Sequence, residues 1–110
     1  MKNTLVIKVI IILFLSFSAH SKQNNIIGGY GLLDCGEIIS DWEKSDVFKN
    51  VYGAYLNGVL TGMFYTTNTA TTSSPQALQL YTLNYCKQNP LEPFMYAIEE
   101  TFQKVAQPLE

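Results

Sequence analysis

Apolar residues recur at helical spacing near the end of the chain, where they form one unbroken stripe. Successive members of the stripe are four, three, four and three positions apart: Leu91, Met95, Ile98, Phe102 and Val105. This pattern predicts a helix over residues 90 to about 107. Asn89 suits its N-cap, Pro90 suits its first position, and Glu92 can reach back to close a capping box.

A second stripe predicts a helix over residues 32–44. Its apolar positions are Leu32, Cys35, Ile39 and Trp42, and the face is widened by Ile38. Four acidic residues lie largely off this face: Asp34, Glu37, Asp41 and Glu43. They lack the spacing and the loop glycine of an EF-hand, so we expect a solvated acidic face rather than a calcium site.

The next helix is predicted to begin at a cap formed by Ser45 or Asp46 and to run to about Tyr65. One side of it carries Val47, Val51, Tyr55 and Val59. An adjacent side carries small residues at every fourth position, the small-residue ribbon: Ala54, Gly58 and Gly62. Small residues at this spacing let two helix backbones approach closely. We expect the ribbon to pack inside the core; the alternative is a homodimer in which two copies meet there.

Residues 66–74 carry no charge and no large apolar group, which predicts a mobile polar loop. Ser74 then suits a helix N-cap, and Pro75 suits the first helical position. The apolar positions that follow are Leu78, Tyr81 and Tyr85, broadened by Leu80, Leu83 and Cys86. No alternating strand pattern of useful length occurs. The sequence therefore predicts a small all-α domain of four helices.

The N-terminal segment predicts a cleaved signal peptide over residues 1–21. Lys2 and Lys8 accompany an apolar run over residues 9–17, and Ala19 and Ser21 occupy the positions that a signal peptidase reads. We expect cleavage after Ser21, export to the periplasm and no stable membrane anchor, because the run is shorter than the ~20 residues of a span. The alternative is a retained anchor. Residues 22–31 predict a flexible segment, and residues 32–107 a single helical domain.

Removing this leader changes the chemistry that the chain can perform. It takes away the single histidine, His20, and the chain contains no arginine. Five lysines and nine carboxylates remain, a net charge of about −4 near neutral pH. Without a basic face we expect no nucleic-acid binding. Without histidine we expect no histidine-based catalyst and no metal, and without the lysine that a phosphate loop requires after its glycines we expect no cofactor. A carboxylate-pair enzyme is the alternative, but the acids cluster on surface faces and a small helical domain has little room for a cleft, so we expect no catalytic residue.

Two cysteines remain, Cys35 and Cys86. In an oxidising compartment they leave one intramolecular pairing. Closing a loop of this length stabilises a fold by roughly 4 kcal/mol in the chain-entropy model. A redox-active pair is the alternative, but such pairs usually need CxxC spacing. The sequence therefore predicts a structural disulfide.

Over residues 32–105 the chain resembles the small periplasmic HdeA/HdeB-like proteins. The resemblance rests on Cys35 and on a turn between two helices in which Cys86, Asn89 and Pro90 match a Cys-x-x-Asn-Pro pattern. It implies an exported helical protein with one disulfide that acts as an acid-stress chaperone and holds unfolding clients on apolar surface. The charge-free centre over residues 50–85 and the glycine-rich helix depart from those chaperones, which bears on acid activation rather than on the fold.

A second resemblance concerns the glycine-rich helix. Residues 53–58, Gly-Ala-Tyr-Leu-Asn-Gly, followed by Gly62, look like the Gly-Tyr-x-x-Gly helix of Tai-type immunity proteins. Those proteins neutralise cell-wall amidases delivered by type VI secretion, although their cysteines are placed differently. This resemblance implies binding and inhibition of one secreted amidase.

Together these features predict a protein-binding protein without catalytic activity. In the chaperone version, acid takes the side-chain charge from about −4 to about +5 near the carboxylate pKa of ~4 and loosens the fold. Aromatic surface for unfolded periplasmic clients is then released at Phe64, Tyr65, Phe94 and Tyr96. The immunity version predicts a rigid face for one partner, and a structural role is a third interpretation. Candidate protein-binding or helix-packing residues are Tyr55, Gly58, Gly62, Phe64, Tyr65 and Phe94.

Overall fold

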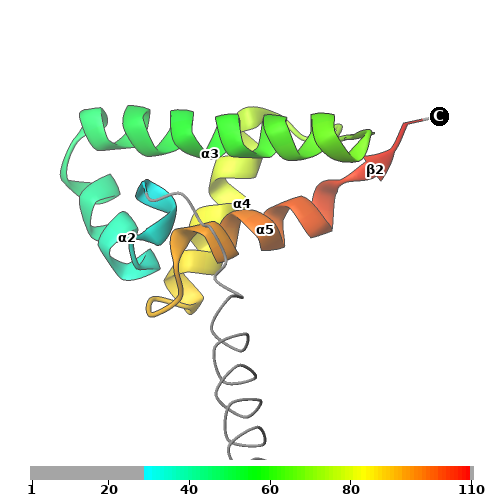
Figure 1. Cartoon of the computed structure of the whole chain (residues 1–110). Coiled ribbons are helices and arrows are strands. Elements are labelled where there is room, and N and C mark those ends of the chain that lie inside the picture. The colour runs from blue at the N-terminus through cyan, green and yellow to red at the C-terminus, as the bar shows by residue number, and fades with distance from the viewer. Residues whose placement is uncertain (1–28, 110) are drawn as a thin grey trace, which may run out of the picture.

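The computed structural model describes residues 29–109, so the predicted signal peptide and its cleavage site lie outside the described residues. Residues 29–109 form a short 3-10 helix, four α-helices and two very short strands (Figure 1). In order these are η1 (Tyr30–Leu32), α2 (Cys35–Lys44), α3 (Asp46–Thr67), β1 (Thr69–Ala70), α4 (Pro75–Gln88), α5 (Phe94–Val105) and β2 (Gln107–Pro108). The predicted all-α fold of four helices is confirmed.

Helix α3 lies across one side of the molecule, α5 runs beneath it, α4 crosses behind both, and α2 closes one end (Figure 1). The helices meet in one apolar core, whose buried members come from all four: Cys35, Ile38, Tyr52, Leu56, Leu60, Leu78, Leu83, Cys86, Phe94, Ala97 and Ile98. Within residues 29–109, none of the helices combines the length and the apolar character that crossing a membrane requires.

The predicted disulfide between Cys35 and Cys86 is present, and both residues are fully buried. It joins the first residue of α2 to the last turn of α4. The loop between α4 and α5 supports this junction, because the backbone N–H of Cys35 donates to the carbonyl of Glu92 (2.7 Å) and that of Gly36 to Pro90 (2.8 Å). These carbonyls partner N–H groups that the start of a helix leaves free.

Two predicted helix starts are confirmed. The side chain of Ser45 caps α3 by accepting from the backbone N–H of Phe48, and Ser74 caps α4 by accepting from Ala77 (3.1 Å). Pro75 takes the first position of α4, where its missing N–H has no intrahelical partner to lose.

The predicted start of the last helix is wrong. Helix α5 begins at Phe94, four residues later than expected, and Asn89 ends α4 instead of capping the next helix. Its backbone N–H donates to Tyr85 and Cys86 carbonyls, and its side-chain amide donates to the Tyr85 carbonyl. The reason is the second proline, since a residue before proline avoids the α conformation and Glu92 precedes Pro93. Leu91 therefore lies outside the helix and is 87% exposed.

Two further predictions differ from the structure, the start of α2 and the buried face of α3. The apolar face of α2 itself is as predicted: Cys35 and Ile38 are buried, and Ile39 and Trp42 pack against the core. Helix α2 begins at Cys35 and not at Leu32, which belongs to η1 and is exposed. In α3 the buried positions follow the predicted ones by a single residue, so Val47 is exposed and Val51, Tyr55 and Val59 are only half-buried. The buried residues of this helix are Tyr52, Gly53, Leu56 and Leu60.

In α4 the predicted face is displaced because a threonine takes part in the core. Thr82 is fully buried and its hydroxyl lies 2.6 Å from that of Thr101 on α5, while Tyr81 and Leu80 are exposed. Each threonine hydroxyl also contacts the carbonyl four residues earlier. Hydrogen bonds to each other and to these carbonyls give both hydroxyls partners, which removes most of the cost of burying them, so a polar residue stands where an apolar one was expected.

Part of the polar segment 66–74, which was predicted to be a mobile loop, belongs to a helix or to a strand pair. Helix α3 continues to Thr67, and Thr69–Ala70 then pairs antiparallel with Gln107–Pro108. The 3-10 helix likewise brings the end of the predicted flexible segment into the fold, since Gly31 is buried close to Tyr55 and Met95. The described domain therefore runs from Gly29 to the C-terminal strand.

Candidate protein-binding site

Three of the predicted site residues take part in packing within the fold. Phe94 is fully buried, and the ring of Tyr55 stacks on it with centroids 6.1 Å apart. Phe64 is half-buried against Phe102, at 5.3 Å between centroids. Only unfolding or rearrangement can offer the ring of Phe94 to a client.

The other three lie on the outer surface of α3. Tyr65 is 88% exposed, and Gly58 and Gly62 are exposed with no atom within 4 Å of where a Cβ would stand. Ala54 is exposed as well. The expectation that the small-residue ribbon packs inside the core is wrong, because α3 turns the ribbon outward. A homodimer through the ribbon remains a prediction.

Replacing Gly58 or Gly62 by alanine is expected to stabilise the fold. Each added methyl meets open space, and alanine in a helix interior is favoured over glycine by about 1 kcal/mol. Urea unfolding followed by circular dichroism measures the gain. Gly31→Ala is the opposing control, since its Cβ would collide with Tyr55 and Met95 and should destabilise. A loss of stability in Gly58→Ala would mean that the ribbon is covered in solution.

A surface feature at the edge of α4 and α5 was not predicted. Two cavities of about 230 Å³ each meet at Tyr85, which lines both: one lies between α4, the α4–α5 loop and α5, and the other is lined by α4 alone. We call the two cavities together the Tyr–Glu groove. Its lining residues are Tyr81, Asn84, Tyr85, Gln88, Glu92, Tyr96, Glu99, Glu100 and Gln103.

The α4–α5 loop holds the centre of this groove in place. The hydroxyl of Tyr85 donates to Oε2 of Glu92 at 2.5 Å. The backbone of Glu92 is fixed at the same time, because its N–H donates to the Asn89 carbonyl and its carbonyl accepts from Cys35. The hydrogen bond to Glu92, with smaller effects of desolvation and the neighbouring carboxylates, raises the pKa of Tyr85 to about 12.

The raised pKa of Tyr85 predicts a late step in an alkaline titration. Because the folded-state value lies above the ordinary 10.0, the stabilising contribution is complete below pH 10 and is lost as pH rises toward 12. Absorbance of tyrosinate measures this, and the difference between the native chain and Tyr85→Phe isolates one phenol. We expect that phenol to ionise near pH 12. Ionisation near pH 10 would mean that the bond to Glu92 does not persist in solution.

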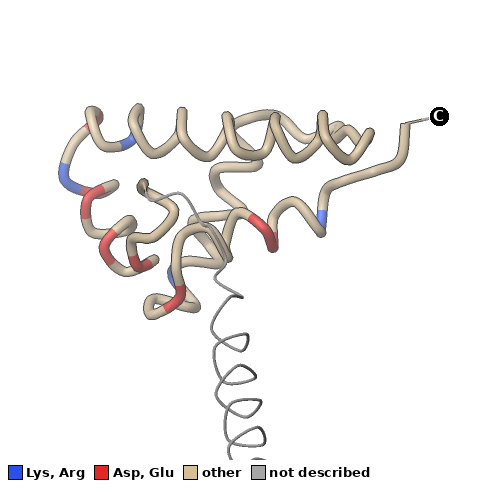
Figure 2. The backbone as a smooth tube through the Cα atoms, viewed as in Figure 1, with Lys and Arg blue, Asp and Glu red and all other residues tan. Residues whose placement is uncertain are grey.

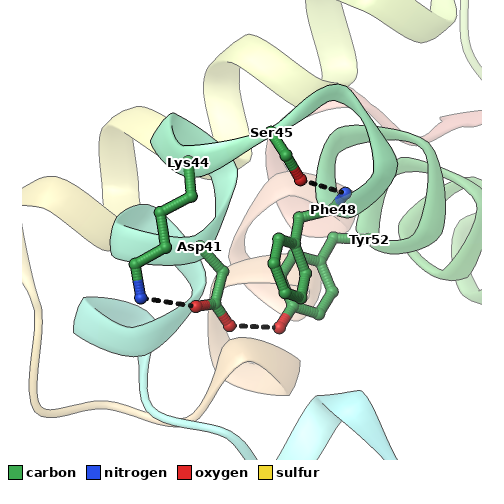
Figure 3. Close-up of polar contacts among 5 residues, drawn as sticks. All are labelled: Asp41, Lys44, Ser45, Phe48 and Tyr52. Carbon is green, nitrogen blue, oxygen red and sulfur yellow. Dashed lines mark hydrogen bonds and ion pairs between the residues drawn. The ribbon is translucent and has the colours of Figure 1, made fainter.

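A second tyrosine–carboxylate pair joins α2 to α3 outside the groove. The hydroxyl of Tyr52 donates to Oδ2 of Asp41 at 2.6 Å, while Oδ1 faces Lys44 at 3.5 Å (Figure 3). Burial, followed by the bond to Asp41, raises the pKa of Tyr52. The Ser45 cap lies beside this pair. Asp41 therefore has partners within the chain on both oxygens.

Unlike Asp41, the carboxylates that line the groove form no ion pair within residues 29–109. Within residues 29–109 the ion pairs are Lys44–Asp41 and Lys49–Asp46, both between neighbouring turns near the α2–α3 junction. None involves Glu92, Glu99 or Glu100, and no lysine lines the groove. Figure 2 shows the acidic positions of α5 distant from the charges around the α2–α3 turn, with a lysine position, Lys104, further along α5. The described residues also contain no group of three acidic, histidine or cysteine side chains placed to hold a metal.

A sequence signal for the groove existed. On α4, Tyr81, Tyr85 and Gln88 are four and three positions apart, and a matching stripe begins in the α4–α5 loop and continues along α5. Its members are Glu92, Tyr96, Glu99 and Gln103. The apolar spacing places Tyr81 and Tyr85 on the core face of α4, whereas in the structure they line the polar edge of this helix.

Comparisons with known proteins add no relative. No protein-family model, no curated protein and no solved structure matched the chain. The resemblances to HdeA/HdeB-like proteins and to Tai-type immunity proteins therefore remain predictions.

Proposed function

We propose that this is an exported, non-catalytic protein that binds a protein partner in its folded state. The observation that carries the proposal is the Tyr–Glu groove, a formed surface feature with tyrosines and carboxylates along its length. Tyrosine is enriched in protein interfaces because a rigid ring offers apolar area and one polar tip. The predicted leader and the buried disulfide support an oxidising, periplasmic location.

The groups available in the groove favour binding over catalysis. The lining residues include no serine, cysteine or histidine, and one oxygen of Glu92 is already engaged by Tyr85. Each cavity, at about 230 Å³, falls below the ~300 Å³ at which small-molecule pockets usually begin. A pair of carboxylates that hydrolyses a sugar needs a cleft that holds the sugar ring between them, and cavities of this size offer little room for one.

An immunity-type inhibitor is the form of this function that the geometry supports best. Such a protein needs its binding face formed before the partner arrives, and the disulfide and the α4–α5 loop hold Glu92 and Tyr85 in that state. The test is hydrolysis of cell-wall peptide by a panel of secreted amidases at neutral pH, with and without the oxidised mature chain. We expect inhibition of one member at equimolar ratio, lost on reduction of the disulfide. Inhibition of none, together with client protection only in acid, would overturn this version.

An acid-stress chaperone is the second candidate, and a specific observation favours it. Two contacts between elements depend on carboxylates, Tyr52 with Asp41 and Tyr85 with Glu92. In acid the net charge of the mature chain becomes positive, and the added repulsion acts on the elements that these contacts join. Near-ultraviolet circular dichroism of Trp42 and the tyrosines, with binding of a hydrophobic dye, follows the transition. Loss of tertiary signal between about pH 4 and 2, with suppressed client aggregation, supports a chaperone. An unchanged spectrum down to pH 2 contradicts it.

A further inference from the structure

We propose that the Tyr–Glu groove binds a basic segment of its partner by holding an arginine or lysine side chain between its tyrosine rings and its carboxylates. The inference rests on the proposed protein-binding function and specifies the chemistry of the partner. It is carried by three features of the groove: unbalanced charge, aromatic walls of suitable size, and a fixed central carboxylate.

The charge of the groove calls for a cationic occupant. Glu92, Glu99 and Glu100 line one cavity, and no cationic side chain lines either of them. The lysines that form ion pairs within residues 29–109 do so with Asp41 and Asp46, near the α2–α3 junction. Like charges brought together without a counter-charge repel, and a bound cation relieves that repulsion.

The aromatic walls favour an organic cation over a metal ion. Tyr85 separates the two cavities, while Tyr81 and Tyr96 are partly exposed on either side. A guanidinium or ammonium group gains from a tyrosine face, and its methylene stem covers apolar ring surface. Within residues 29–109, no group of three or more acidic, histidine or cysteine side chains is placed to hold a metal ion. The planar guanidinium, which can stack on a ring and pair with a carboxylate at once, suits the groove better than ammonium.

The central carboxylate needs little reorganisation on binding. Glu92 is held through its backbone by Asn89 and Cys35 and through Oε2 by Tyr85. Its other oxygen has no hydrogen-bond partner among the described residues. A carboxylate fixed before the partner arrives loses little side-chain entropy on binding.

The experiment is an NMR titration of the isotope-labelled, oxidised mature chain at low salt. The probe is a capped Gly-Arg-Gly-Arg-Gly peptide, compared with its lysine and glutamate counterparts and with calcium chloride alone. We expect amide shifts confined to residues 81–103 with the arginine peptide, smaller ones with lysine, and none with glutamate. No shift with the arginine peptide, or the same shifts with calcium, overturns the proposal.

Matched variants separate the groove from general acidity. Glu99→Gln/Glu100→Gln removes two groove charges, and Glu37→Gln/Glu43→Gln removes two exposed charges from α2. We expect about tenfold weaker peptide binding in the first and less than twofold change in the second, with the same circular dichroism in both. Equal weakening of peptide binding in the two double variants would contradict binding at the groove. Amidase inhibition that survives Glu99→Gln/Glu100→Gln keeps the proposed function and overturns this inference.

Discussion

Removing the disulfide between Cys35 and Cys86 is expected to lower the free energy of unfolding by about 4 kcal/mol. The two residues are 51 positions apart, and freeing a loop of this length restores that much chain entropy to the unfolded state. Small domains have only about 5–15 kcal/mol of stability in total. The loss is therefore large enough to leave a sizeable unfolded fraction at 37 °C.

Urea unfolding of the oxidised and reduced chain, followed by far-ultraviolet circular dichroism, measures this difference. Cys35→Ala/Cys86→Ala is the companion variant, because serine would leave two hydroxyl groups in a fully buried site. A difference below about 1 kcal/mol between oxidised and reduced chains would show that non-covalent contacts are enough to fix the α2–α4 junction. The backbone bonds from Cys35 and Gly36 to the α4–α5 loop would then be its main support.

Phe94→Ala is expected to cost about 3–5 kcal/mol. The ring is fully buried and contacts two others, Tyr52 at 6.2 Å and Tyr55 at 6.1 Å between centroids. Its removal loses the transfer free energy of the ring and leaves a cavity that surrounding helices fill only in part. Phe94 also begins α5, and its N–H donates to the Leu33 carbonyl, so the ring and backbone fix the same junction.

Thermal and urea unfolding measure the loss, with Phe64→Ala as the matched control. Phe64 is only half-buried and packs on a single ring, so its truncation should cost clearly less than that of Phe94. Equal losses for the two variants would contradict the placement of Phe94 at the centre of the core. Retained stability in Phe94→Ala would contradict it more directly.

Much of the fold was predictable because local signals and core packing agree. Ser45 and Ser74 cap the helices that their positions predicted, and two cysteines allowed only one pairing. The start of α5 was missed because two signals compete at one turn. Asn89 and Pro90 favour a new helix, but Pro93 restricts Glu92, and Asn89 instead satisfies carbonyls at the end of α4.

The candidate site could not be predicted in the same way. Which face of α4 meets α5 depends on a buried contact between Thr82 and Thr101, and periodicity of apolar residues gives no weight to threonine. Once these two hydroxyls meet in the core, Tyr81 must lie at the edge. The sequence contains the polar stripes of both segments, but their meeting at one edge depends on a contact between residues 19 positions apart, which no local pattern reports.

The fold is closed at its two ends by bonds of different kinds. A covalent link fastens α2 to α4 at one end, whereas at the other the C-terminal Gln107–Pro108 is joined to Thr69–Ala70 by a two-residue ladder (Figure 1). Such a short ladder opens readily, so amide protons should exchange with solvent fastest there and slowest beside the disulfide. We therefore expect opening of the C-terminal strand to leave the centre of the groove in place, where Tyr85 is bonded to Glu92 next to the disulfide.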